Sequence, residues 1–404
     1  MLSPDAALRR ILSTLQDVAP LPPERTPLAD AFGRALALDV LAPADLPAFD
    51  ASTMDGYALR AADAGRPGAR LPIAFEVYAG HPAPGPLTPG TCCRITTGAA
   101  LPEGADCVEM QEEVRRTSGA ATFRRAAERG RFVRPRASDL PAGAVALPAG
   151  TVVDHGAIGL AAGLGRAELV VRRRPRLAIL PTGDELVPPG APLGPGQAYE
   201  SNGQALASAA REAGAEPFVL PAAHDDARSL AAALEAARGF DALVTNGGVS
   251  VGARDLVRAA LDALGARMRF WRVSIRPGKP FLFGLWGRTA TFGVPGNPAS
   301  ALVTFELFVR PALRVLAGLS GHGRVEAVAT LASAQEKPSE LTVYLRVRLR
   351  RGPGGLVAEP LRTQLSGHHS SATGHDALAI LPAGKSRLPR GAKVAVRIVN
   401  APSR

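Results

Sequence analysis

The sequence has little cysteine, little lysine and no long apolar run, and each shortage excludes a class of protein. Its 404 residues include three cysteines, too few for a disulfide framework or a four-thiolate metal site. We expect them to be small buried side chains in a reducing compartment. No uninterrupted apolar stretch reaches the roughly 18 residues of a membrane span, and the N-terminus has no apolar segment typical of a secretory leader. The sequence therefore predicts a cytoplasmic protein with no membrane association.

The charge balance is basic but does not indicate a nucleic-acid partner. The chain has 47 basic and 36 acidic residues, a formal net charge of +11, which by itself favours a polyanionic ligand. The arginines are dispersed, however, and aromatic residues make up only 5% of the chain, so no basic stretch is interleaved with stacking side chains. Only four basic residues are lysine (Lys279, Lys337, Lys385 and Lys393). We attribute the abundance of arginine to coding bias and predict no nucleic-acid partner.

The first 172 residues indicate a helical region interrupted by a small β domain. Residues 1–42 carry apolar side chains at helical spacing, and Thr26 with Pro27 predicts the start of a second helix after the break at Pro22-Pro23. Residues 43–141 contain short β-like runs separated by glycine and proline. These runs are residues 73–78, 92–96, 107–110 and 121–125. Residues 142–172 complete the first region, so the β domain would be an insertion.

The rest of the chain predicts an α/β domain followed by a second β domain. Residues 173–320 alternate strands with helices, which is typical of a three-layer domain with a parallel sheet between helices. The predicted strands are 177–180, 218–220, 242–245 and 270–274, and the predicted helices are 201–213, 226–237, 255–264 and a long one from Pro298. Residues 321–404 have period-two runs at 342–349 and 393–399, which predict a compact, barrel-like β domain. The fold class is α/β, multidomain.

Polar, glycine-rich turns follow the predicted strands, at the edge where parallel sheets bind ligands. In TGDEL at 182–186, Asp184 and Glu185 can hold a hard cation or accept protons, although the same acids could merely cap a helix. In NGGVSVG at 246–252, free amides and a hydroxyl suit a phosphate. The alternative for this second turn is tight packing at Gly247.

Two further turns offer positive charge and a helix start. RPGKP at 276–280 places Arg276 and Lys279 on a proline-stiffened turn. Because the chain otherwise uses arginine, Lys279 indicates a need for a compact ammonium; the alternative is a solvated turn. PGNPAS at 295–300 puts Pro298 in the first turn of a helix whose amides favour an anion, although ordinary helix starts look the same.

Outside this domain the candidate residues are weaker. Asp55 lies in STMDGY, Thr97 lies in a glycine-rich loop, and Asp139 follows a basic run. Motifs of these three kinds are more often simple turns than functional sites. No histidine set has metal-binding spacing. The chain also has no phosphate-binding loop with the GxxxxGK[ST] pattern and no GxSxG elbow. The sequence therefore disfavours an ordinary ATPase or serine hydrolase.

Taken in order, the motifs closely resemble the molybdopterin molybdenumtransferase (molybdenum insertase) family, to which the C-terminal domain of gephyrin is related. The strings that match are STMDGYALR at 52–60, ITTGAALPEGADCVEMQEE at 95–113, TGDEL, NGGVSVG, RPGKP, PGNPAS and, more weakly, QLSGHHSS at 364–371. The resemblance implies an elongated homodimer of four-domain subunits, with each site between the α/β domain of one subunit and the inserted domain of its partner. There, adenylylated molybdopterin and molybdate would be converted, with a divalent cation such as Mg²⁺, to molybdenum cofactor and AMP.

The resemblance also assigns roles to residues. It implies catalytic roles for Asp55, Asp139, Glu185, Asp225 and Asp255, and metal binding by Asp184, Glu185 and Asp225. The substrate-binding residues it implies are Thr97, Gly183, Asp184, Gly247, Gly248, Ser250, Arg276, Lys279, Pro295, Pro298, Ser300, Arg346 and Ser366. Further expected partners are the adenylyltransferase that supplies the nucleotide and the molybdoenzyme apoproteins that receive the product.

The sequence departs from the family pattern at four positions, and two other functions stay open. Ala51 stands where the family usually has Asn, and Ser138 stands where it has an acid beside Asp139. Glu109 replaces a usually apolar residue, and Arg276 replaces a lysine. An adenylyltransferase acting on ATP would share the TGDEL-like and GGVS-like turns, but the two β domains argue against it. A non-catalytic scaffold is the other alternative. The retained acids argue against it, because a scaffold has no reason to keep buried like charges.

Overall fold

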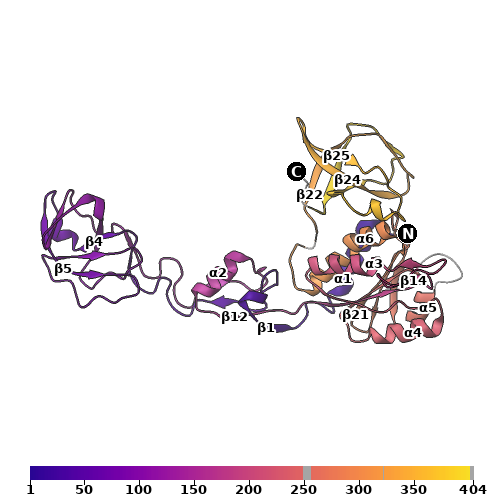
Figure 1. Ribbon diagram of the computed structural model, residues 1–404, viewed down its shortest axis with the longest axis horizontal. Helices are drawn as coiled ribbons and strands as arrows, with labels where there is room; N and C mark the ends of the chain where they lie inside the picture. Colours follow the sequence, from indigo (N-terminus) through magenta and orange to yellow (C-terminus); the bar gives the residue numbers. More distant parts are fainter. Residues whose placement is uncertain (249–255, 322, 401–404) are drawn as a thin grey trace. The chain divides into compact units, whose positions relative to one another are not determined.

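The computed structural model describes residues 1–248, 256–321 and 323–400 (Figure 1). The chain forms two compact units. Unit 1 comprises residues 1–37, 150–154 and 170–404, and unit 2 comprises residues 38–149 and 155–169. The boundaries of the four predicted domains stay a prediction. None of the described helices is long and apolar enough to span a membrane.

Unit 1 begins with one helix, not two. In α1 (Pro4–Leu15), the Ser3 side chain accepts a hydrogen bond from the Ala6 amide at 3.2 Å and caps the start. The second predicted helix is wrong. Residues 23–27 form strand β1 (Pro23–Pro27), which pairs with β12 (Glu168–Arg172), and a 3-10 turn follows at Leu28–Asp30. Three prolines remove the amides that a helix needs, and the Thr26 hydroxyl accepts a hydrogen bond from Arg34 instead of capping.

The central sheet of unit 1 has six strands, and five of them run in the same direction. In spatial order they are β16 (Glu216–Val219), β13 (Arg176–Pro181), β17 (Ala242–Asn246), β21 (Thr289–Val294), β20 (Leu282–Trp286) and β18 (Arg267–Trp271). The parallel pairs β16–β13–β17–β21 confirm the predicted alternation. Strand β20 is the reversed strand of this sheet, since it pairs antiparallel with both β21 and β18. The turn of residues 287–288 between β20 and β21 is too short for a parallel crossover.

Helices cover both faces of this sheet (Figure 1). On β13, Leu177 and Ile179 pack into one core with α1, α3 (Asn202–Glu212) and the helical run from Pro298, whereas Ala178 and Leu180 pack into a second core with α4 (Ala227–Ala236) and α5 (Leu256–Ala263). This alternation follows from the period of two in a strand. The predicted long helix is confirmed as α6 (Pro298–Thr304), a π-helical turn (Phe305–Val309) and α7 (Arg310–Leu316).

The C-terminal part of unit 1 is a closed five-stranded barrel, as predicted. Its strands are β24 (Thr342–Gly352), β25 (Gly355–Pro360), β22 (Glu326–Leu331), β28 (Lys393–Ile398) and β26 (Ala377–Leu381), and the pairing of β26 with β24 closes it. Strand β19 (Ile275–Arg276) pairs in parallel with β24, so that Arg276 lies opposite Val343. The RPGKP turn therefore starts at the barrel, and not at the central sheet as we expected.

Short pairs complete unit 1. Strand β14 (Leu186–Val187) pairs with β15 (Ala198–Tyr199), β23 (Gln335–Glu336) pairs with β27 (Arg387–Leu388), and a 3-10 turn covers His369–Ser371.

Unit 2 is built on a six-stranded sheet. Its order is β7 (Cys107–Met110), β4 (Gly56–Leu59), β6 (Cys92–Ile95), β5 (Arg70–Val77), β9 (Ala120–Phe123) and β8 (Val114–Thr117), and four of these strands confirm the predicted β runs. Two smaller pairs, β3 (Ala51–Ser52) with β10 (Val133–Arg134) and β2 (Val40–Leu41) with β11 (Val145–Leu147), accompany helix α2 (His155–Gly163) and 3-10 turns at Ala61–Ala64 and Gln111–Glu113.

The three cysteines are core residues of unit 2. Cys92, Cys93 and Cys107 are all fully buried and form no disulfide. Burial raises the pKa of each thiol to about 12. They are therefore unreactive apolar side chains, as predicted.

Candidate functional site

The first predicted turn leaves the carboxyl end of β13 and meets the loop that follows β16. A parallel bridge joins Thr182 to Ala223. The Asp184 carboxylate accepts a hydrogen bond from the Asp225 amide at 3.1 Å, and the same oxygen, Oδ1, lies 3.1 Å from Nδ1 of His224. The predicted acids Asp184, Glu185 and Asp225 therefore come from two adjacent loops at one edge of the sheet.

These acids are exposed, which corrects our expectation of buried like charges. The Asp184 side chain is 67% exposed, and Glu185 and Asp225 are exposed as well. Throughout residues 1–248, 256–321 and 323–400, no three acidic, His or Cys side chains converge to hold a metal ion. Mg²⁺ commonly uses one or two carboxylates together with phosphate and water oxygens. The acids fit such an open arrangement and not a cage made by the protein alone.

The second turn packs directly on the first. Gly247 has a φ of +100°, and a Cβ there would lie 2.7 Å from the Thr182 hydroxyl oxygen and 2.8 Å from its carbonyl oxygen. Only glycine fits this contact. Tight packing therefore explains Gly247, and Gly248 beside it has a φ of +64°. Ser250 and Asp255, predicted in substrate binding and catalysis, lie outside the described residues.

Two asparagines tie the second turn to the start of α6. The side chain of Asn246 is buried and donates to the Pro295 carbonyl at 2.8 Å. Its oxygen accepts a hydrogen bond at 2.9 Å from Asn202, whose amide also donates to the Gly296 carbonyl at 2.6 Å. Sequence reasoning missed Asn202, for which the only signal was a polar residue that opens a helix at the ligand-binding edge.

The start of α6 is in turn bound to a loop of the barrel. Asn297 donates to the hydroxyl oxygen of Ser366 at 3.2 Å, and the Ala299 amide donates to the Ser366 carbonyl at 3.1 Å. Pro298 occupies the first helical turn, as predicted. The turns after β13, β17 and β21 and the barrel loop therefore form one connected rim.

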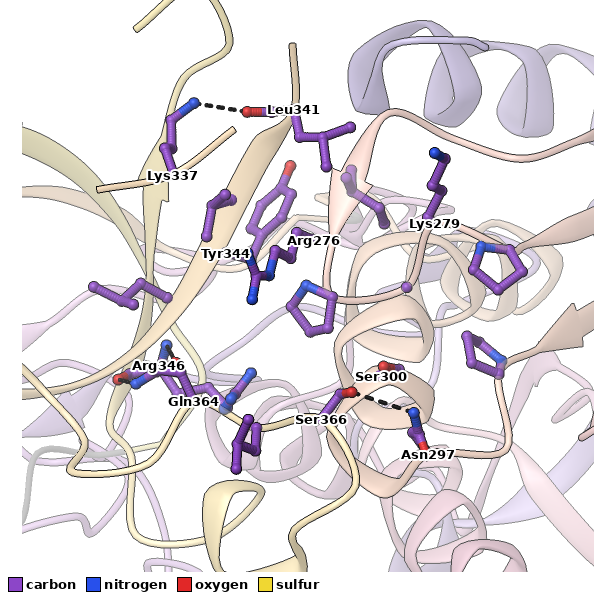
Figure 2. Close-up of a pocket in the computed structure, with 18 of the residues that line it drawn as sticks. Arg276, Lys279, Asn297, Ser300, Lys337, Leu341, Tyr344, Arg346, Gln364 and Ser366 are labelled. Carbon is purple, nitrogen blue, oxygen red and sulfur yellow. Dashed lines mark hydrogen bonds between the residues drawn. The ribbon is translucent and has the colours of Figure 1, made fainter. Parts of the chain in front are cut away.

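A pocket of about 520 Å³ opens where this rim meets the barrel (Figure 2). Six predicted substrate-binding residues line it: Arg276, Lys279, Pro295, Ser300, Arg346 and Ser366. Figure 2 shows Asn297, Ser300 and Ser366 close to one another, with Arg346 and Gln364 from the barrel beside them. Asn297, Gln364 and Lys337 also line the pocket, and sequence reasoning gave none of them a binding role.

The lining is strongly basic. Arg276, Lys279, Lys337 and Arg346 contribute four cations, and Glu336 contributes one carboxylate. Lys337 donates to the carbonyls of Pro338 and Leu341 at 3.0 and 2.8 Å. The turn that carries Arg276 and Lys279 fits closely on α6, since a Cβ at Gly278 would lie 2.3 Å from a methyl of Thr304. An excess of cations on a shaped wall suits a small polyanion.

Arg346 is the most constrained of these cations. It lies on β24 and is 1% exposed. Within the part of the chain that the structure describes, its Nε and Nη2 atoms have no hydrogen-bond partner. Burial lowers the pKa of Arg346 to about 10, so it is protonated at neutral pH. A buried charge without a partner is costly, and an anion in the pocket would compensate it.

Unit 2 holds the remaining predicted residues. The Asp55 carboxylate accepts hydrogen bonds from the amide and hydroxyl of Thr97 at 2.7 and 2.8 Å, and these bonds lower the pKa of Asp55. Asp139 forms an ion pair at 3.3 Å with Arg134, which lies opposite Ala51 in the β3–β10 pair. Asp55, Thr97 and Asp139 therefore surround one short strand pair.

Glu109, a departure from the family pattern, is an unusual core residue. It is 1% exposed on β7, and its carboxylate oxygens have no hydrogen-bond partner in the described residues. The nearest cation is Arg131, 3.7 Å away. Burial raises the pKa of Glu109. Nothing in the structure explains why a carboxylate stands at this position.

Known proteins resemble the chain along nearly its whole length. Residues 2–165 match the MoeA N-terminal region (domain I and II), residues 178–315 a probable molybdopterin binding domain, and residues 328–399 the MoeA C-terminal region (domain IV). Molybdopterin molybdenumtransferase of Synechococcus elongatus is 36% identical, with 98% of this chain and 99% of that protein covered. Molybdopterin molybdenumtransferase 2 of Mycobacterium tuberculosis is 38% identical, with 83% of this chain and 85% of that protein covered.

A solved structure agrees with these relatives. The molybdopterin biosynthesis MoeA protein of Pyrococcus horikoshii superposes with a TM-score of 0.83 at 33% identity, covering 97% of this chain and 98% of that one. The motifs, the fold and the relatives all lead to the same assignment, and the chain belongs to the MoeA family of molybdopterin molybdenumtransferases.

Proposed function

We propose that the protein inserts molybdate into adenylylated molybdopterin, forming molybdenum cofactor and releasing AMP. The observation that carries this proposal is the basic pocket, in which the Nε and Nη2 atoms of the buried Arg346, beside Ser300 and Ser366, have no hydrogen-bond partner among the described residues. Molybdate is a tetrahedral dianion. Fixed cations and hydroxyl groups around a small cavity would bind and orient it without reorganisation.

The adjoining rim would receive the nucleotide. The tight turn at Gly247 and the Asn202–Asn246 pair bring backbone groups to the carboxyl edge of the sheet, where phosphates bind in folds of this class. Asp184, Glu185 and Asp225 would hold Mg²⁺ together with phosphate oxygens. When bound, the cation would polarise the phosphoanhydride and neutralise its charge. Glu185, exposed beside this position, would accept a proton from the attacking water.

The barrel argues against an adenylyltransferase as the alternative. Arg346, Gln364 and Ser366 line the pocket from the barrel, which an enzyme consisting of the α/β domain alone would lack. The buried guanidinium of Arg346 also argues against a scaffold. Its Nε and Nη2 atoms have no hydrogen-bond partner in the part of the chain that the structure describes, and a protein with no anion to bind would gain stability from an apolar residue there.

We further propose that the protein works as a homodimer in the cytoplasm. Asp55 and Asp139 of one subunit would complete the site of its partner, as the family resemblance implies. The adenylyltransferase and molybdoenzyme apoproteins would be the partners that deliver the substrate and receive the product.

One experiment tests the reaction. The protein is incubated with adenylylated molybdopterin, molybdate and Mg²⁺, while AMP and molybdenum cofactor are measured. We expect both products, in equal amounts and dependent on molybdate. Lys279→Ala should weaken the use of molybdate more than that of the pterin nucleotide. Formation of adenylylated molybdopterin from ATP and molybdopterin, with no molybdate-dependent AMP, would contradict the proposal.

A further inference from the structure

The backbone of Arg346 is held by one side chain, that of Gln364. The Gln364 carboxamide oxygen accepts a hydrogen bond from the Arg346 amide at 3.1 Å. Its nitrogen donates to the Arg346 carbonyl at 2.9 Å and to the Leu361 carbonyl at 3.3 Å. Both main-chain polar groups of the buried arginine are therefore bound by the same planar group.

The local strand pairing explains why a side chain is needed there. Strand β25 pairs with β24 up to the pair Val347–Pro360, and then ends. Arg346 lies one residue beyond this pair, and a main-chain group of a buried residue must be satisfied. The Leu361 amide donates to the Arg346 carbonyl at 3.0 Å, and Gln364 supplies the other partners. The carboxamide thus acts as the missing strand neighbour of Arg346.

Gln364 also begins the loop that carries Ser366. Ser366 is two positions further along the loop and is bound to the start of α6 by Asn297 and by the Ala299 amide. The loop is closed at its far end by Ser371, whose hydroxyl donates to the Leu365 carbonyl at 2.5 Å. Gln364 is therefore the point at which the arginine strand and the serine loop are joined.

We infer that Gln364 is a positioning residue, which holds the Arg346 guanidinium and the Ser366 hydroxyl at one separation, set for a tetrahedral dianion. The inference rests on the proposed function of the pocket. Gln364 acts through Arg346 and Ser366, so its loss should affect the dianion more than the pterin nucleotide. An electrostatic site loses much of its strength when its donors are misplaced by a fraction of an ångström.

The test compares Gln364→Met, which keeps the length but cannot form the three bonds, with Gln335→Met. Gln335 also lines the pocket, but among the residues that the structure describes its side chain bonds only to Ser333. With the pterin nucleotide saturating, we expect Gln364→Met to raise the KM for molybdate at least about tenfold, with kcat and the KM for the nucleotide within about twofold. Gln335→Met should change neither kcat nor either KM by more than about twofold. If Gln364→Met does not fold, Gln364→Asn replaces it in the same measurements, because it keeps the carboxamide on a side chain too short to form these bonds.

A double variant separates positioning from general damage. If Gln364 acts through Arg346, then Gln364→Met should add no further loss of molybdate use to Arg346→Met. Additive losses, or equal losses for molybdate and nucleotide, would overturn the inference.

Calorimetric titration with tungstate keeps the inference distinct from the proposed reaction. Weaker tungstate binding by Gln364→Met than by the wild type and Gln335→Met supports the inference even if the wild type releases no AMP. An active wild type with Gln364→Met indistinguishable from Gln335→Met overturns the inference and leaves the reaction standing. A wild type that neither turns over nor binds tungstate overturns both.

Discussion

At the scale of single residues, the pocket is defined by one arginine that the fold does not need. Among the described residues, the Nε and Nη2 atoms of Arg346 have no hydrogen-bond partner, and its side chain lies on the face of β24 opposite the apolar barrel core that Val343, Leu345 and Val347 form. Replacing a buried charge by an apolar residue of similar size is often neutral or stabilising, by about 1–4 kcal/mol. The arginine therefore lowers the stability of the protein in exchange for anion binding.

This argument predicts opposite effects of one substitution on stability and on function. Arg346→Met should leave the free energy of unfolding unchanged or raise it by about 1–4 kcal/mol, while molybdate-dependent AMP release falls at least about a hundredfold. Thermal unfolding and the AMP assay measure the two effects. The control is Arg348→Met, on the same strand but exposed, which should retain activity. A large loss of stability in Arg346→Met would show that the guanidinium has a structural partner.

In unit 2, Thr97 controls the ionisation of Asp55. The Thr97 amide is the main cause that lowers the pKa of Asp55, and the Thr97 hydroxyl is the second. A carboxylate with a lowered pKa contributes stability above its unfolded pKa and loses it as the pH falls through its folded pKa. The contribution of Asp55 is therefore fully present at neutral pH and is lost in the acid range, below the ordinary value of an aspartate.

Thr97→Val tests this control. The variant keeps the amide and loses the hydroxyl, so the pKa of Asp55 should rise part of the way back toward its ordinary value, and the acid loss of stability should begin at higher pH. Carboxyl-carbon NMR titration of Asp55 measures the shift. The control is Thr117→Val, at another threonine of unit 2, whose hydroxyl donates to the Ala120 carbonyl and not to a carboxylate in the described residues. An unchanged pKa of Asp55 in Thr97→Val would show that the hydroxyl bond does not form in solution.

Which site residues could be predicted depended on how far along the chain their partners lie. The motif residues Asp184, Arg276 and Lys279 stand in short strings that could be recognised by themselves. Gln364 stands in the weaker string QLSGHHSS, but neither its role nor that of Asn202 could be predicted, because their partners lie 18 and up to 94 positions away and become neighbours only when the barrel closes and the sheet orders its strands. A polar residue whose partner is distant in the sequence has no local sequence pattern from which its role could be predicted.

At the scale of elements, the alternation of strands and helices predicted the central sheet, and prolines and short pairings accounted for the errors. The second N-terminal helix had the capping residues of a helix, but its prolines favoured strand β1. Strand β19 has two residues, too few for any periodicity, so its pairing with the barrel strand β24 could not be predicted. That pairing brings Arg276 to the pocket.

The elements around the rim are joined by Asn202, which gives a prediction at this scale. In Asn202→Ala, the buried oxygen of Asn246 loses its donor, which should cost about 1–3 kcal/mol of unfolding free energy. The turns after β17 and β21 would also separate, so the KM for the pterin nucleotide should rise more than the KM for molybdate. Steady-state kinetics and chemical denaturation measure both. The control is Asn400→Ala, which removes an exposed bond to the His375 carbonyl and should change neither KM by more than about twofold. Loss of molybdate affinity alone would contradict the assignment of this rim to the nucleotide.

At the scale of the whole molecule, the candidate residues divide between the two compact units. The basic pocket and the acids Asp184, Glu185 and Asp225 belong to unit 1, and Asp55, Thr97 and Asp139 belong to unit 2. The family resemblance implies that the second set serves the partner subunit. A two-fold symmetric dimer would then have two composite sites, each made from unit 1 of one subunit and unit 2 of the other.

Subunit mixing tests this arrangement. Asp55→Asn and Glu185→Gln should each be nearly inactive as homodimers, because each lacks one half of every site. In a heterodimer of the two variants, one site carries both substitutions and the other carries neither. Mixing under conditions that allow exchange should therefore restore about half of the wild-type activity per heterodimer. As a control, mixing Asp184→Asn with Glu185→Gln should restore none, because both residues lie in unit 1. If exchange is verified by mass and activity does not return, or if a monomer is fully active, the acids of unit 2 serve their own chain or no site at all.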